Sequence, residues 1–266
     1  MYGLDWMKRS AINAFVAIAG LLLLPQAASA QLKVMISGGF SGPYEKLLPE
    51  FERTSGIKVT TGSGSSQGSG PQTIGAQLAR GVTTDVVILS REGLDDLIAA
   101  KRVAAGTDVD LARTPIGVAV RAGAPKPDVS TVEAFKQTLL KAKAVAVPGS
   151  TSGIFLTTQI FPRLGIADRI NLKRTARGAD APAMVAKGEA DIAVLPVSEI
   201  LHAPGVELGG VIPEEIQLHQ IFAAAVVAGS KEAEAGKRLI SFLASERASA
   251  AIKSGGMEPL GKRGQP

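Results

Sequence analysis

The sequence predicts an α/β fold in which buried strands of a mostly parallel sheet alternate with helices. Between Leu32 and Lys101, short runs of aliphatic and β-branched residues alternate three times with apolar residues at helical spacing. Aromatic residues make up only 4% of the chain, so its apolar content comes from Ala, Val, Leu and Ile, which favours strands covered by alanine-rich helices. Two stretches rich in Gly, Ser and Thr each follow a predicted strand and precede a predicted helix. In such folds, ligands bind at the carboxyl ends of the strands.

The first half of the chain predicts three strand–helix pairs. Strands are expected at residues 32–37, 57–60 and 85–89, and helices at residues 44–54, 73–80 and 94–101. The segments that follow the strands, at residues 38–42, 64–69 and 90–91, would open on one edge of a parallel sheet. Ser41 is the expected N-cap of the first helix.

The second half continues the same alternation. Strands are expected at residues 116–121, 144–147, 170–174, 191–195 and 217–228, and helices at residues 131–140, 154–164, 181–187, 231–245 and 248–253. The last of these strands would lead the chain back into its first half.

The stretch from Thr61 to Pro71, TGSGSSQGSGP, is the most unusual in composition. A loop of this kind that opens a helix can bind an anion, because the first N–H groups of the helix have no partner within it. The alternative interpretation is a flexible linker. The stretch from Pro148 to Gly153, PGSTSG, repeats the same chemistry after another strand, which favours the anion site.

The N-terminal residues predict export. Lys8 and Arg9 precede an apolar run from Ala11 to Leu24, and an A-x-A cleavage site ends at Ala30, so residues 1–30 are expected to be a signal peptide and the protein periplasmic. The absence of cysteine excludes a lipoprotein and a disulfide scaffold. The net charge of +5 is spread along the chain, which argues against a nucleic-acid partner and favours a small anionic ligand.

Four runs, together with the Gly/Ser loop described above, resemble the type 2 periplasmic solute-binding proteins, and most closely their molybdate-binding branch. They are VMISGGFSG at residues 34–42, FERTSGIKVT at 51–60, LARGVTTDVVIL at 78–89 and KGEADIAVLPVSE at 187–199. The resemblance implies two α/β lobes joined by two crossing strands, with residues 31–112 plus 225–266 as lobe one and residues 113–224 as lobe two. It also implies a monomer without cofactor or metal that holds an anion between its lobes and delivers it to an ABC-type permease.

The resemblance further implies a set of ligand-binding residues in the cleft. These are Gly39, Phe40, Ser41, Ser66, Gln67, Arg91, Ser150, Thr151, Ser152, Gly153 and Ser198. The chain departs from the molybdate-binding pattern at three places: Gly39 replaces a serine, Pro196 replaces a tyrosine, and Arg91 follows the third strand. A guanidinium suits a planar carboxylate, so an organic di- or tricarboxylate is expected rather than molybdate. The alternative for Arg91 is a surface ion pair with Glu92 or Asp95.

Two functions remain open from the sequence. The favoured one is a binding protein for uptake. The alternative is an isomerase on the same scaffold, because aconitate isomerase, which acts on a tricarboxylate, resembles this family. Moving a double bond requires a base near the cleft, and Glu199 or an activated serine hydroxyl are the candidates. His202 and His219 carry no partner motif and are expected to be structural.

Overall fold

The computed structural model describes residues 31–261. The expected signal peptide, residues 1–30, lies outside the described residues. Within the described range, no helix has both the length and the apolar character that crossing a bilayer requires.

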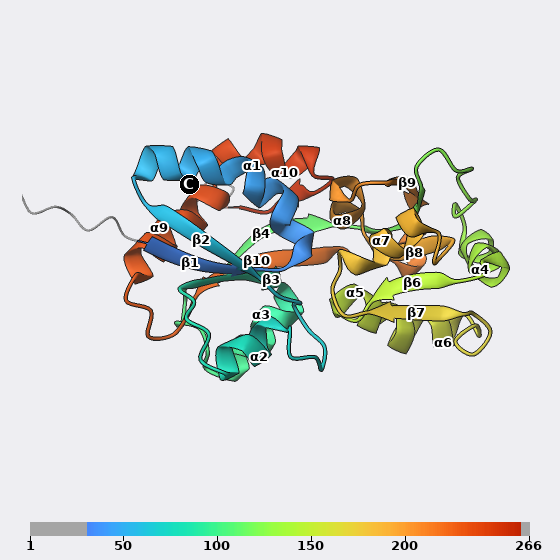
Figure 1. The fold of residues 1–266 in the computed structure, drawn as a ribbon, viewed down its shortest axis with the longest axis horizontal. Helices are drawn as coiled ribbons and strands as arrows, with labels where there is room; N and C mark the ends of the chain where they lie inside the picture. Colours follow the sequence, from blue (N-terminus) through green and yellow to red (C-terminus); the bar gives the residue numbers. More distant parts are fainter. Residues whose placement is uncertain (1–30, 262–266) are drawn as a thin grey trace, which may run out of the picture.

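Two separate sheets form the frame of the molecule (Figure 1). The first has the strand order β11-β4-β10-β3-β1-β2, and its strands are β1 Gln31–Ile36, β2 Lys58–Ser63, β3 Val86–Ser90, β4 Val109–Thr114, β10 Gln220–Val226 and β11 Glu258–Pro259. The second has the order β7-β6-β8-β5-β9, and its strands are β5 Ile116–Arg121, β6 Val145–Pro148, β7 Leu172–Thr175, β8 Ile192–Pro196 and β9 Val206–Val211.

Each sheet is mixed rather than fully parallel. In the first sheet β2, β1 and β3 are parallel, whereas β10 runs antiparallel to both β3 and β4. In the second sheet β6 is parallel to β7 and β8, whereas β5 is antiparallel to β8 and β9. The predicted two-lobed α/β fold is therefore confirmed, with antiparallel strands added where the chain passes between the lobes.

Helices cover both faces of each sheet. In lobe one they are α1 Gly38–Ser55, α2 Ile74–Ala79, α3 Arg91–Ala99, α9 Ala233–Leu243 and α10 Ser249–Ser254. In lobe two they are α4 Val132–Lys141, α5 Thr151–Phe155, α6 Phe161–Arg163, α7 Asp180–Lys187 and α8 Val197–His202, with a π-helical turn at Leu156–Ile160 between α5 and α6. Short 3₁₀ turns occupy Glu214–Ile216 and Glu246–Ala248.

Alternation along the strands explains how each sheet buries both faces. On β1, Val34 and Ile36 pack in the cluster formed with α1, α9 and α10, whereas Met35 packs in the cluster formed with α2 and α3. This follows from the opposite directions of successive side chains in a strand. Because both faces are covered, the ends of the strands are where a polar ligand can approach.

The chain passes between the lobes twice. It leaves the first sheet after Thr114 and enters the second at Ile116; it leaves the second after Val211 and re-enters the first at Gln220. The predicted boundaries, after residues 112 and 224, fall inside β4 and β10, and both strands belong wholly to the first sheet.

Several segments differ from their sequence-based assignment. Residues 38–42, expected as a turn, form the first turn of α1, whose N-cap is Ser37 rather than Ser41. Arg91, expected in a loop, is the first residue of α3. His202, for which no helix was expected, is the last residue of α8.

Candidate functional site

A small cavity of about 120 Å³ lies where the two lobes meet. Lobe one contributes the end of β1, the Gly/Ser loop after β2 and the start of β10, and lobe two contributes the loops after β6 and β7 and the start of α8. Its lining residues are Ser37, Gly38, Ser63, Gly64, Ser65, Ser66, Pro148, Ser150, Ser152, Arg177, Gly178, Ala179, Glu199, Gln220 and Phe222. At a share of about 30 Å³ per liquid water, this space holds on the order of four waters. It suits a small anion and excludes a peptide.

Helix N-termini converge on the cavity from both lobes. Ser37 and Gly38 open α1, which has 18 residues and no acidic residue in its first turn. Ala179 is the N-cap of α7, and Ser150 is the N-cap of α5. N-terminal N–H groups and the helix dipole favour negative charge at such a place. The cavity is therefore suited to an anionic ligand.

The serine hydroxyls at the cavity are held by neighbouring backbone groups. Ser66 Oγ accepts a hydrogen bond from the N–H of Ser90 at 2.9 Å, and Ser150 Oγ accepts one from the N–H of Gln67 at 3.4 Å. Because each oxygen accepts from the backbone, its own hydrogen is left to donate to a ligand. Ser152, also in the lining, is 3% exposed.

Glu199 brings a carboxyl group into this cavity from the first turn of α8. Its Oε2 is covered and has no hydrogen-bond partner in residues 31–261. Burial raises the pKa of Glu199 to about 7. The carboxyl lies between two glycines of different lobes: a Cβ atom on Gly38 would be 3.1 Å from Oε2, and one on Gly178 would overlap with it. Small residues at both places are what allow the carboxyl to fit.

Arg177 supplies the positive charge in the lining. Its NH2 group donates to Asp180 Oδ1 at 2.8 Å, and this pairing raises the pKa of the guanidinium. The side chain is 61% exposed, so it can turn toward a ligand carboxylate at little cost.

The lobes are closed over the cavity by hydrogen bonds between them. Ser65 Oγ donates to the carbonyl of Ala176 at 2.8 Å, and the hydroxyls of Ser90 and Thr151 are 2.7 Å apart. Thr151 also donates to Gln67 Oε1 at 3.0 Å. The hydroxyls of Ser65, Ser90 and Thr151 thus tie one lobe to the other.

Three of the residues predicted to bind the ligand line the cavity: Ser66, Ser150 and Ser152. Gln67 and Thr151 lie beside it and join the lobes through the hydrogen bonds described above.

The other predicted residues have different surroundings. Gly39 packs under the ring of Phe222, Phe40 is fully buried in the core of lobe one, and Gly153 packs against the carbonyl of Pro148. Ser41 donates to the carbonyl of Gly38 at 2.7 Å, whereas the N–H of Ser198 donates to Thr114 Oγ1 at 3.3 Å.

Arg91, the cation expected at the cleft, lies outside this cavity. Its guanidinium donates to Asp108 Oδ2 at 2.9 Å and pairs with Asp110, while Asp95 Oδ1 lies 3.7 Å away. Partial burial lowers the pKa of Arg91, but the hydrogen bonds and charges of Asp110 and Asp108 together outweigh it, so the pKa is raised. The alternative ion pair considered from the sequence is present with Asp95, and two further aspartates join it.

Sequence reasoning did not single out Ser37, Arg177, Gly178 or Gln220. Gln220 is a lone polar residue at the start of an apolar strand, QIFAAAV, and this contrast is a signal that could have marked it. Ser37 directly precedes the glycines of the first turn. Arg177 and Gly178 lie in a loop with no recognisable pattern, so only the fold brings them to the cavity.

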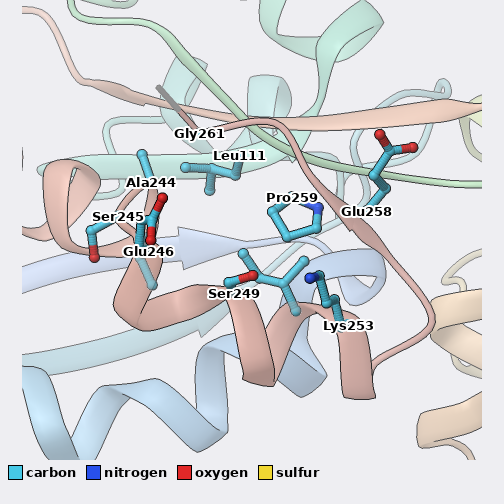
Figure 2. A pocket seen from close by; sticks show the side chains of 11 residues that line it. Leu111, Ala244, Ser245, Glu246, Ser249, Lys253, Glu258, Pro259 and Gly261 are labelled. Atoms are coloured by element: carbon cyan, nitrogen blue, oxygen red, sulfur yellow. The ribbon is translucent and has the colours of Figure 1, made fainter. Parts of the chain in front are cut away.

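A second hollow lies in lobe one. It is bordered by α10 and the stretch from Glu258 to Gly261, as Figure 2 shows, and measures about 430 Å³. None of the covered polar atoms without a partner in residues 31–261 lies on the residues that line it. Its size alone does not make it a binding site. No group of three His, Cys, Asp or Glu side chains in the described range is arranged to hold a metal ion.

Comparison with known proteins shows similarity over nearly the whole described range. Residues 32–258 match the family described as bacterial extracellular solute-binding protein. The chain is 37% identical to the aconitate isomerase of a Pseudomonas species, over 94% of this chain and 95% of the relative.

Solved structures share the fold at lower identity. The molybdate-binding protein of Azotobacter vinelandii superposes with a TM-score of 0.66 at 20% identity, covering 85% of this chain and 98% of that one. The sulfate-binding protein SubI of Mycobacterium tuberculosis gives a TM-score of 0.69 at 19% identity, covering 87% of each chain.

Proposed function

Because the chain belongs to the bacterial extracellular solute-binding proteins, we propose that its interlobe cavity binds aconitate and interconverts the cis and trans isomers. The 37% identity to an aconitate isomerase over nearly the full length of both chains supports this activity. The fold alone does not distinguish it from transport, because the structural neighbours named above are binding proteins.

The observation that carries the proposal is the carboxyl of Glu199. When ionised, a buried carboxylate in the binding cavity repels an anionic ligand, so holding the anion does not by itself call for one. A general base, in contrast, works best when its pKa lies near the operating pH. Burial has moved the pKa of Glu199 to about 7, which is that range.

The reaction follows from the position of this base. Aconitate carries a CH₂ group between a carboxylate and the double bond. Glu199 removes one proton from this CH₂. The electron pair of the broken C–H bond and the former double bond then form a carbanion that is delocalised over three carbons. Return of the proton to the carbon at the other end of the three-carbon system completes the shift. No atom is gained or lost, and the new double bond can form with either geometry.

The surroundings of Glu199 stabilise the charge that develops. The N-termini of α1 and α7 and the hydroxyls of Ser66 and Ser150 lie in the same lining as the base. Fixed donors of this kind hold an enolate-like carboxylate more strongly than water does, since they need no reorientation during the reaction.

A second candidate function is binding of the same anion for uptake. The family match and the anion-binding structural neighbours favour it. In that case the closed lobes would present the ligand to an ABC-type permease, with the protein acting as a periplasmic monomer after removal of residues 1–30. Export would serve either function.

The test measures turnover and binding separately. The mature chain from Gln31 should convert trans-aconitate to the cis isomer, followed by ultraviolet absorbance. Replacing Glu199 by Gln should lower kcat by at least about 10²-fold, the usual contribution of a general base, while aconitate still raises the melting temperature. The matched control is Glu214→Gln, an exposed carboxylate that pairs with His219.

Two outcomes would decide against the isomerase. Stabilisation by aconitate without any turnover in the unaltered protein would leave the uptake function. Stabilisation by molybdate or sulfate alone, with citrate and both aconitates inert, would exclude a carboxylate ligand altogether. Mass action makes the melting temperature a readout of binding in both cases, whereas ultraviolet absorbance reports turnover.

A further inference from the structure

Polar atoms that have no partner gather in this cavity. Five covered side-chain atoms in residues 31–261 lack a hydrogen bond, and three of them belong to residues of this lining: Ser37 Oγ, Gln220 Oε1 and Glu199 Oε2. Ser37 is 4% exposed and Gln220 is 3% exposed. Buried polar groups are normally paired, so a cluster of exceptions in a cavity indicates a missing ligand group.

The hydroxyl of Ser37 has no partner because it does not cap its own helix. It occupies the N-cap of α1, yet its side chain makes no capping hydrogen bond. A serine at this position usually accepts from an N–H of the first turn. Here both the hydroxyl of Ser37 and the first N–H groups of an 18-residue helix remain available at the cavity.

The residues on the two sides of Glu199 differ in charge and in burial. The carboxyl of Glu199 lies against Gly38 on one side and Gly178 on the other. Ser37 directly precedes the first glycine and Arg177 directly precedes the second. The base therefore lies between a buried, uncharged polar group and an exposed cation.

We propose that Ser37 and Gln220 form a subsite for one carboxylate arm of the ligand, and that this subsite makes the cavity selective for tricarboxylates over dicarboxylates. The inference rests on the proposed function, because it assigns the arms of that substrate. One carboxylate takes the subsite and a second meets Arg177. The carbon between them then faces Glu199.

The chemistry of the two side chains fits a carboxylate. The Ser37 hydroxyl donates one hydrogen bond, and the Gln220 amide donates a second when its NH₂ group faces the ligand, which a half-turn of the amide allows. The amide makes no hydrogen bond within the described residues, so the turn breaks none. A bare tetrahedral oxyanion in the serine-lined part would leave these two groups unpaired.

The test compares ligands that differ by one carboxylate. Dissociation constants of trans-aconitate and of mesaconate, which lacks one arm, are measured by titration calorimetry. The unaltered protein should bind trans-aconitate at least about tenfold more tightly. Ser37→Ala and Gln220→Met should each weaken trans-aconitate binding about tenfold and leave mesaconate binding within about twofold, so that the selectivity collapses. Ser241→Ala and Gln137→Met, both at exposed positions, are the matched controls.

The outcomes separate this inference from the proposed function. Unchanged selectivity in both variants would overturn the subsite, even if the protein is an isomerase. Selectivity that collapses in a protein without turnover would support the subsite and reject the isomerase. If Gln220→Met fails to fold, Ser37→Ala decides alone, because it removes one oxygen atom from the end of β1 without adding bulk.

Discussion

Glu199 shows how a single residue is adjusted by its surroundings. Burial raises its pKa to about 7. The serines, the glycines and the two helix N-termini around it carry no full charge. The full positive charge of the lining is therefore that of Arg177, which can pair with a ligand carboxylate. The carboxyl of Glu199 can exchange a proton near neutral pH.

The raised pKa of Glu199 predicts how stability depends on pH. Between about pH 4.5 and 7 the folded protein keeps a proton that the unfolded chain releases, so this group lowers the free energy of unfolding as the pH rises. A shift from 4.5 to about 7 corresponds to about 3 kcal/mol above pH 7. Glu199→Gln should therefore be more stable than the unaltered protein at pH 8 and equally stable at pH 4.

Urea unfolding of the ligand-free protein at several pH values checks this prediction. The difference between the two proteins should grow over the interval in which Glu199 titrates. Parallel pH profiles for the variant and the unaltered protein would show that Glu199 titrates normally, and its role as a base near neutral pH would lose its support.

The two arginines considered for the ligand differ in what already surrounds them. Arg91 is held by three aspartates, so Arg91→Ala should leave the affinity for aconitate within about twofold. Arg177 has one partner and lines the cavity, so Arg177→Ala should weaken binding by about tenfold, the effect of one lost charged hydrogen bond. Calorimetric titration with trans-aconitate measures both. The reverse order would return Arg91 to the site.

At the scale of the elements, strongly apolar strands were predictable and short or polar elements were not. The strand predicted at residues 116–121 is β5, because its five leading residues are buried and form a continuous apolar pattern. β4, VDLART, and β9, VELGGV, were not predicted, since charges and glycines interrupt their patterns. Their pairing with β10 and β5 in the sheets fixes them instead.

The candidate site was predictable only in part for a related reason. Its Gly/Ser loops have a recognisable composition, and Ser66, Ser150 and Ser152 were found through it. Phe40 and Gly153 lie in similar stretches of the sequence but do not face the cavity. Phe40 is buried in the core, and Gly153 packs against the carbonyl of Pro148. Gln220 and Arg177 come from distant parts of the chain, so no local pattern could place them together.

The start of α5 acts as part of the closure between lobes. Thr151 exchanges a hydrogen bond with Ser90 and donates another to Gln67, both from lobe one. Thr151→Val keeps the shape and removes both contacts, so the closed state should be less populated. Apparent affinity falls with that population. We expect aconitate to bind about three- to tenfold more weakly.

The same variant should also enlarge the ligand-free molecule in small-angle scattering, because fewer molecules are closed. Thr158→Val is the control, since Thr158 lies on the helical continuation of α5 and bonds only to the carbonyl of Ile154. Equal affinity and equal radius for Thr151→Val and the unaltered protein would show that these hydrogen bonds do not set the degree of closure.

At the scale of the whole molecule, the two lobes divide the work of the site. Lobe one supplies Ser37, Ser66 and Gln220, and lobe two supplies Ser150, Arg177 and Glu199. Neither lobe holds the base and the proposed carboxylate subsite by itself. Closure therefore assembles the reactive arrangement and removes water from it at the same time.

The strand order of the first sheet has a consequence for how the chain reaches its native state. β10 lies between β3 and β4, yet about 100 residues separate it from β4 along the chain. Everything from β5 to β9 is one continuous segment and can pair locally. Lobe one, although it begins the chain, is left with two open strand edges until β10 is synthesised and inserted between them. The lobe that starts first is thus the lobe that is completed last, and the cavity exists only after that final insertion.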